Sequence, residues 1–144
     1  MYKIEKSISI NRAQQEVFDY VTDPAKSAEW QSGIISSEWT SDDPPGVGST
    51  IRTSARYLGR KIDTEVEITE WDRPNRVSFK TVSGPVPAEF TQTFEAQDDG
   101  TLLSFTAQAE FGGFFKLAEG LAGRQLEKQA ENDLSTLKLM LEEG

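Results

Sequence analysis

Hydrophobic and polar residues alternate along most of this chain, and the period of the alternation identifies its elements. At the N-terminus, Tyr2, Ile4, Ile8 and Ile10 stand at every second position, interrupted only by Lys6, with polar residues between them. This is the period of a half-buried β-strand. We therefore expect the chain to begin with a strand.

Two short helices are expected next. Asn11 stands three residues before Gln14, a near variant of the capping box that begins many helices. The apolar residues that follow at helical spacing are Ala13, Val17, Phe18 and Val21. Asp23 then precedes Pro24, which pairs a good N-cap with a residue suited to the first helical position. This predicts a second brief helix that ends near Trp30.

From Ile34 to Phe111 the pattern has period two and is broken by five turn segments, at 42–46, 58–60, 72–75, 83–85 and 98–100. Five turns imply six strands. Their spacing leaves no room for the crossover helices that parallel pairing needs, so we expect an antiparallel meander with the first strand joined to one edge.

Each predicted strand carries apolar residues on one face only, so the sheet needs a cover. A helical stripe of apolar residues runs from about Phe114 to Glu142 and supplies it. The sequence thus predicts an α+β fold of one domain, residues 1–144. In it a curved seven-stranded antiparallel sheet surrounds a long C-terminal helix, with two short helices between strands one and two.

Charge and composition narrow the classes of partner. The 144 residues carry a formal net charge of −9, which disfavours nucleic acid as a partner. There is neither cysteine nor histidine, so disulfides and thiolate metal sites are excluded. No apolar run approaches the roughly 18 residues of a spanning helix, and the first residues lack a signal peptide's apolar core. We expect a cytoplasmic protein without stable membrane insertion, and both monomer and homodimer stay open.

Several local motifs are similar to those of a known family. They are the Asp23-Pro24 to Glu29-Trp30 segment, Pro45-Gly46-Val47-Gly48-Ser49, Glu70-Trp71-Asp72-Arg73-Pro74-Asn75-Arg76-Val77, and the helix end from Leu134-Ser135-Thr136-Leu137-Lys138 through Glu142. Together with the order of elements, they resemble the START-like, or SRPBCC, superfamily of helix-grip proteins, which includes the birch-pollen-allergen-like proteins. The branch they resemble is that of polyketide cyclases/dehydrases and lipid-transport proteins. The resemblance implies a ligand such as a lipid, a sterol or a polyketide.

A curved sheet that grips a helix leaves a tapering cavity, which is the default ligand site. Alternation turns several aromatic residues and one glutamine toward it. The predicted ligand-binding residues are Phe18, Trp30, Tyr57, Phe79, Phe90, Gln92, Phe94, Phe105, Phe114 and Leu121. The aromatic walls would supply affinity, and Tyr57 and Gln92 would supply orientation.

Catalysis has little support in the sequence. Tyr57 is a weak candidate for an acid, and no other catalytic residue is predicted. The carboxylates of the sheet alternate with apolar residues and are expected on its outer face: Asp63, Glu65, Glu67, Glu89 and Glu95. We expect neither a metal nor a cofactor.

Three functions stay open. The first is a carrier or sensor of a small hydrophobic molecule. The second is an enzyme similar to polyketide cyclases or dehydratases, acting in the same cavity without a metal. The third is a protein-interaction module related to chaperone co-factors, which an exposed apolar patch around Trp39 or Trp71 would favour.

Three arginines, Arg52, Arg56 and Arg60, gather on one predicted hairpin of this acidic chain. They could dock an acidic partner or headgroup. Pairing with Asp63, Glu65 and Glu67 across the hairpin is the simpler interpretation.

Overall fold

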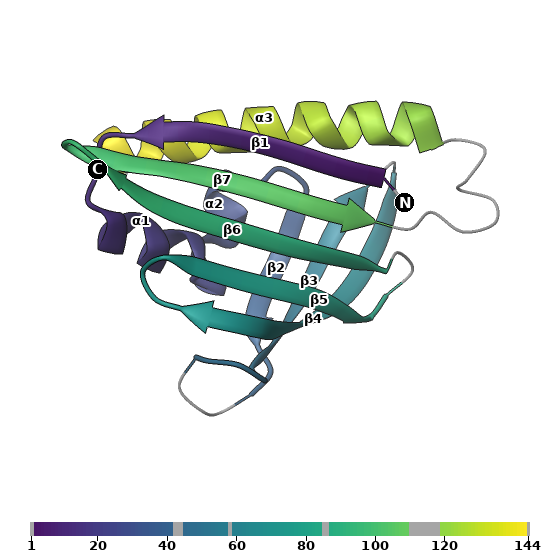
Figure 1. Cartoon of the computed structure of the whole chain (residues 1–144). Helices are drawn as coiled ribbons and strands as arrows, with labels where there is room; N and C mark the ends of the chain where they lie inside the picture. The colour runs from purple at the N-terminus through teal and green to yellow at the C-terminus, as the bar shows by residue number, and fades with distance from the viewer. Residues whose placement is uncertain (1, 42–44, 58, 85–86, 110–118, 144) are drawn as a thin grey trace.

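The computed structural model of the chain describes residues 2–41, 45–57, 59–84, 87–109 and 119–143, and for 2, 57, 119–123 and 126 it describes only the backbone (Figure 1). The elements in chain order are β1 (Tyr2–Ile10), α1 (Gln14–Val21), the 3-10 turn η1 (Pro24–Lys26), α2 (Ser27–Trp30), β2 (Ile34–Trp39), β3 (Thr50–Tyr57), β4 (Arg60–Asp72), β5 (Arg76–Ser83), β6 (Ala88–Gln97), β7 (Gly100–Ala109) and α3 (Glu119–Glu143).

The seven strands form one antiparallel sheet in the order β1-β7-β6-β5-β4-β3-β2. Strands β2 to β7 make the predicted meander, and β1 joins its far edge beside β7. Figure 1 shows the sheet curling, with α3 along β1 and the short helices at the end where α3 finishes. The predicted helix-grip fold is confirmed. No helix in the described ranges is both long and apolar enough to cross a membrane.

The short helices form where expected, but one predicted cap is wrong. Asp23 Oδ1 accepts a hydrogen bond from Ala25 N at 3.0 Å, and Pro24 takes the first position of η1. Asn11, by contrast, does not cap α1, whose N-cap is Ala13 without a side-chain hydrogen bond. The backbone N–H of Asn11 donates instead to the Glu142 carboxylate at 2.9 Å, because β1 ends beside the end of α3.

The core lies at one end of the inner face of the sheet, where α1 and the last turns of α3 cover it. It consists of Ile10, Val17, Phe18, Val21, Trp30, Ile68, Val77, Phe94, Leu103, Leu134 and Leu137. The Phe18 ring meets the Phe94 ring edge-on at 4.9 Å and the Trp71 ring at 5.1 Å. The predicted start of the long helix, 114–118, lies outside the described residues.

Trp71 reaches this core through a shift in strand register. The pairing of β4 with β5 is irregular between Ile68 and Glu70, and beyond it Trp71 pairs with Val77. An extra residue in a strand reverses the face of every side chain after it. Trp71 therefore packs against the core.

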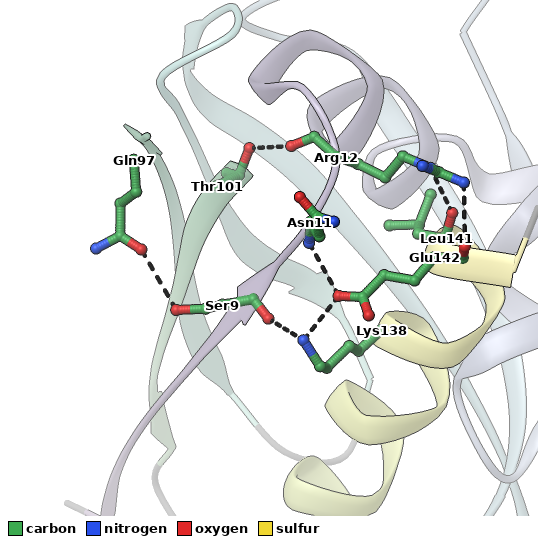
Figure 2. Close-up of polar contacts among 8 residues, drawn as sticks. All are labelled: Ser9, Asn11, Arg12, Gln97, Thr101, Lys138, Leu141 and Glu142. Carbon is green, nitrogen blue, oxygen red and sulfur yellow. Dashed lines mark hydrogen bonds and ion pairs between the residues drawn. The ribbon is translucent and has the colours of Figure 1, made fainter. Parts of the chain in front are cut away.

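Polar contacts connect the end of α3 to the end of β1 and to the residues that follow it (Figure 2). The Arg12 guanidinium donates to the backbone oxygens of Leu141 at 2.7 Å and Glu142 at 3.1 Å. The last carbonyls of a helix have no partner within it and favour a nearby cation. Lys138 Nζ donates to Ser9 O at 2.6 Å from the other side. Both contacts hold α3 in place over the core.

We predict that Arg12→Ala lowers the free energy of unfolding by about 1–2 kcal/mol, because it removes two charge-assisted hydrogen bonds to helix carbonyls. Urea denaturation measures this. The control is Arg124→Ala, at an exposed arginine of α3 with no ion pair in the described part of the chain, which should change stability by less than about 0.5 kcal/mol. Equal losses in the two variants would show that Arg12 does not anchor α3.

Candidate functional site

An apolar cavity of about 260 Å³ lies next to the core. On β5 and β7 it is lined by the next inward-facing residue after one that belongs to the core. On β5 the inward residue after core Val77 is Phe79, and on β7 the one after core Leu103 is Phe105. Phe90 of β6 pairs with Phe79 and stacks on the Phe105 ring at 6.4 Å. The three phenylalanines thus form the sheet wall of the cavity, where the core ends.

The short helices close the other side of the cavity. The end of α1, η1 and α2 contribute Val21, Thr22, Pro24, Ser27 and Gln31. Strands β2 to β4 add Ser37, Ile51, Thr53, Thr64 and Val66. The cap at Asp23 fixes the turn that brings these helical residues over the sheet.

Seven of the fourteen lining residues have polar side chains, and one of these has a buried atom without a hydrogen-bond partner. Ser37 and Thr53 share a hydrogen bond of 3.1 Å between their hydroxyls. The Gln92 Oε1 atom is buried and has no hydrogen-bond partner among the described residues. Two further buried atoms share this condition, Thr81 Oγ1 and Trp30 Nε1, but neither residue lines the cavity. A buried acceptor without a partner carries a desolvation cost of about 1–3 kcal/mol.

The structure divides the predicted ligand-binding residues into three groups. Those that line the cavity are Phe79, Phe90, Gln92 and Phe105. Those that belong to the core and do not line it are Phe18, Trp30 and Phe94. The Tyr57 and Leu121 side chains and all of Phe114 lie outside what the structure describes. Ligand contact by any of them stays a prediction.

The carboxylates of the sheet make contacts away from the cavity. Asp63 accepts from the Ser54 hydroxyl at 2.6 Å, Glu65 accepts from Thr40 at 2.9 Å, and Glu67 lies 3.6 Å from Lys80 Nζ. None of the described lining residues is acidic or basic. In the described ranges, no three acidic side chains gather as a metal site would require.

Polar residues at the edge of the α3 stripe contact the loop before β2 instead of the cavity. Gln129 Nε2 donates to Ser32 O at 2.8 Å, and Asp133 Oδ1 accepts from the Ser32 N–H and hydroxyl, both at 2.9 Å. Burial raises the pKa of the Asp133 carboxyl, and the two hydrogen bonds from Ser32 oppose that rise. Lys6 lies 2.7 Å from Glu131.

The sequence did not predict that residues of the short helices line the cavity. Ser27 and Gln31 are polar residues on a very short helix, and no alternation marks which of them face inward. The one available signal was the cap at Asp23-Pro24, which places the helix but not its faces. The strand residues Thr53 and Thr64 also line the cavity.

Comparison with known proteins identifies related folds. A family model described as polyketide cyclase/dehydrase and lipid transport matches residues 1–142. None of the curated proteins matches the chain. TTHA0849 from Thermus thermophilus has a similar structure, with a TM-score of 0.83 and 22% identity, over 95% of this chain and 94% of that one.

Two further structures are similar at lower identity. A START superfamily protein from Mycobacterium smegmatis has a TM-score of 0.78 and 13% identity, over 98% of this chain and 99% of that one. BexL, the di-domain ARO/CYC of the BE-7585A biosynthetic pathway, has a TM-score of 0.73 and 19% identity, over 95% of this chain and 48% of that one. At these identities the likenesses show the fold.

We predict that Gln92→Leu raises the free energy of unfolding of the ligand-free protein by about 1 kcal/mol. The substitution keeps the approximate size of the side chain and removes an acceptor whose burial is not compensated. Urea denaturation beside Gln15→Leu, at an exposed glutamine of α1, provides the control, which should stay within about 0.5 kcal/mol of the parent. A marked loss of stability in Gln92→Leu would contradict the assignment.

Proposed function

Because the chain belongs to the polyketide cyclase/dehydrase and lipid-transport family of START-like proteins, we propose that it binds a small hydrophobic molecule in the cavity between its sheet and its short helices. We propose a carrier or sensor role for it. The bound molecule lies against Phe79, Phe90 and Phe105, and it leaves the cavity chemically unchanged.

The observation that carries this proposal is the unpaired Gln92 Oε1 beside the phenylalanine wall of the cavity. Phenylalanine walls supply affinity through burial of apolar surface, but they do not orient a ligand. A ligand hydroxyl or N–H that donates to Gln92 would remove the cost of the unpaired acceptor when it binds. The ligand class is therefore an apolar molecule with at least one hydrogen-bond donor.

The volume of the cavity favours a small ligand. Pockets for drug-sized ligands span about 300–1,000 Å³, and the 260 Å³ cavity is slightly smaller than this range. Of the lipid, sterol and polyketide-like classes expected from the family, this size favours a short acyl chain or a molecule of one or two rings.

The other two functions lack a supporting observation. General acid–base catalysis needs a titratable group within reach of the substrate, and the described lining residues include none. Tyr57 stays the candidate acid, with its side chain outside the described part. An interaction module would present an exposed apolar patch at Trp39 or Trp71, and both are half-buried against the core.

Native mass spectrometry of freshly purified protein tests the proposal, with the denatured protein as the mass reference. We expect a retained small molecule that bears a hydroxyl or N–H group, identified after extraction. A ligand-free mass, together with no binding across short-chain lipids and one- or two-ring phenols, would overturn the proposal.

We predict that filling the cavity abolishes binding while the same substitution elsewhere does not. Val66→Phe adds an aromatic ring to the cavity wall, and Val82→Phe makes the same change at a side chain that is 47% exposed and outside the cavity. Titration calorimetry with the extracted ligand should show at least a tenfold weaker affinity for Val66→Phe and none of that loss for Val82→Phe. Equal affinities would place the ligand elsewhere.

A further inference from the structure

Three hydroxyl side chains form a row across neighbouring strands on the inner face of the sheet. Ser37 of β2 pairs with Thr53 of β3, and Thr53 pairs with Thr64 of β4 in an unbroken β3–β4 register. Side chains directly opposite each other on neighbouring strands lie on the same face of the sheet. All three residues line the cavity, and we call them the hydroxyl row. The proposed function assigns them no role.

The hydroxyl row interrupts apolar positions on two strands. On this face of β3 and β4, the residues before and after Thr53 and Thr64 are all apolar: Ile51, Ala55, Ile62 and Val66. Isoleucine or valine would suit the two strand positions equally well without placing a polar group beside the cavity. A hydroxyl that loses contact with water needs another hydrogen-bond partner. The two threonines therefore require a polar group in whatever fills the cavity.

The hydroxyl row has hydrogen-bonding capacity to spare for a ligand. Ser37 and Thr53 share one hydrogen bond of 3.1 Å, in which only one hydroxyl donates, so the hydrogen of the other stays available. The Thr64 hydroxyl makes no hydrogen bond within the described part of the chain. Gly84 has φ +142°, and a Cβ there would lie 3.2 Å from Thr64 Oγ1, so glycine leaves this hydroxyl uncrowded. The row thus offers both donors and acceptors.

The surroundings of the hydroxyl row favour a neutral polar group. The described residues that line the cavity include neither an acidic nor a basic side chain. An ionised group of a ligand would therefore be buried without an opposite charge, which is costly. An anion would in addition be repelled by the net charge of −9 on the chain. Hydroxyl and carbonyl groups fit the row, because they are uncharged and form hydrogen bonds with hydroxyls.

We infer that the ligand of the cavity carries a second polar group, a neutral hydroxyl or carbonyl, which binds to the hydroxyl row while the first polar group donates to Gln92. This inference rests on the proposed function and adds a second polar end to the ligand. Gln92 comes from β6 and the hydroxyl row from β2, β3 and β4, and all four residues line one cavity. The ligand class is a neutral molecule with an apolar middle and two polar ends.

A second hydroxyl on the ligand changes affinity in opposite directions in the two settings that matter. In a purely apolar pocket it would lose its hydrogen bonds to water without replacement and weaken binding on the order of tenfold. Beside the hydroxyl row it replaces those hydrogen bonds, and it satisfies threonine hydroxyls that an apolar group would leave unpaired. A diol is therefore expected to bind more tightly than the alcohol of the same length.

The experiment compares the α,ω-diols of six, seven and eight carbons with the primary alcohols of the same length, by titration calorimetry at pH 7.5. These chains are flexible, so the comparison itself selects the length that joins Gln92 to the hydroxyl row. At that length the diol should bind on the order of fivefold tighter than the alcohol.

Thr53→Val/Thr64→Val keeps the shape of both side chains and removes their hydroxyls. It should abolish the preference for the diol and leave the affinity for the alcohol within about twofold. If this double variant does not fold, Thr64→Val alone makes the same test, since it breaks no hydrogen bond in the described ranges.

The matched control is Thr91→Val/Thr106→Val. Thr91 and Thr106 also pair directly across two strands, and the Thr91 hydroxyl shares a hydrogen bond of 3.1 Å with a serine, as the Thr53 hydroxyl does. Neither residue lines the cavity, so this variant should keep the preference for the diol.

The outcomes separate the inference from the proposed function. If the alcohols bind and no diol binds more tightly, or if both double variants act alike, the inference fails and the proposed function stands. If neither series binds to the folded protein, both fail.

Discussion

The structure depends on the contact between one end of a curved sheet and the helices that cover it. At that end, α1 and the last turns of α3 bury Phe18, Phe94 and Leu137 in a close-packed core. A curved sheet cannot stay in contact with a straight helix along its whole length. The inward residues next along the strands line a cavity, and the end of α1 and the short helices border its other side. The core and the cavity are two consequences of one geometry, and the contacts of Arg12 with the end of α3 help to maintain both.

This arrangement gives the two sets of aromatic residues different roles. Phe18 and Phe94 meet edge-on and are almost fully buried, so they stabilise the fold. Phe79, Phe90 and Phe105 come from the same strand faces but line open space, where a ligand can supply the missing contacts. Gln92 lies on β6 between Phe90 and Phe94, at the boundary between the two regions. Its unpaired oxygen is therefore in the place where it can orient a ligand without disrupting the core.

Much of the fold could be predicted from alternation alone, because strand period and turn residues are local properties of the chain. The seven strands and the cap at Asp23 are examples. The capping role of Asn11 was wrong because α1 begins with Ala13 as its N-cap, and the Asn11 N–H binds the Glu142 carboxylate at the end of α3. Trp71 packs against the core because of a shift in the β4–β5 register, and the alternation of hydrophobic and polar residues does not indicate such a shift. Phe94 belongs to the core and Phe90 lines the cavity. This difference depends on how far the helices extend along each strand, which is a property of the tertiary structure.

We propose that the cavity holds an apolar molecule oriented by Gln92. The most direct test is a crystal structure of the protein as purified, at a resolution that distinguishes a small molecule from ordered water. We expect continuous density against Phe79, Phe90 and Phe105, with a donor atom within about 3 Å of Gln92 Oε1. A cavity filled with separate waters that hydrogen-bond to Gln92 would contradict it.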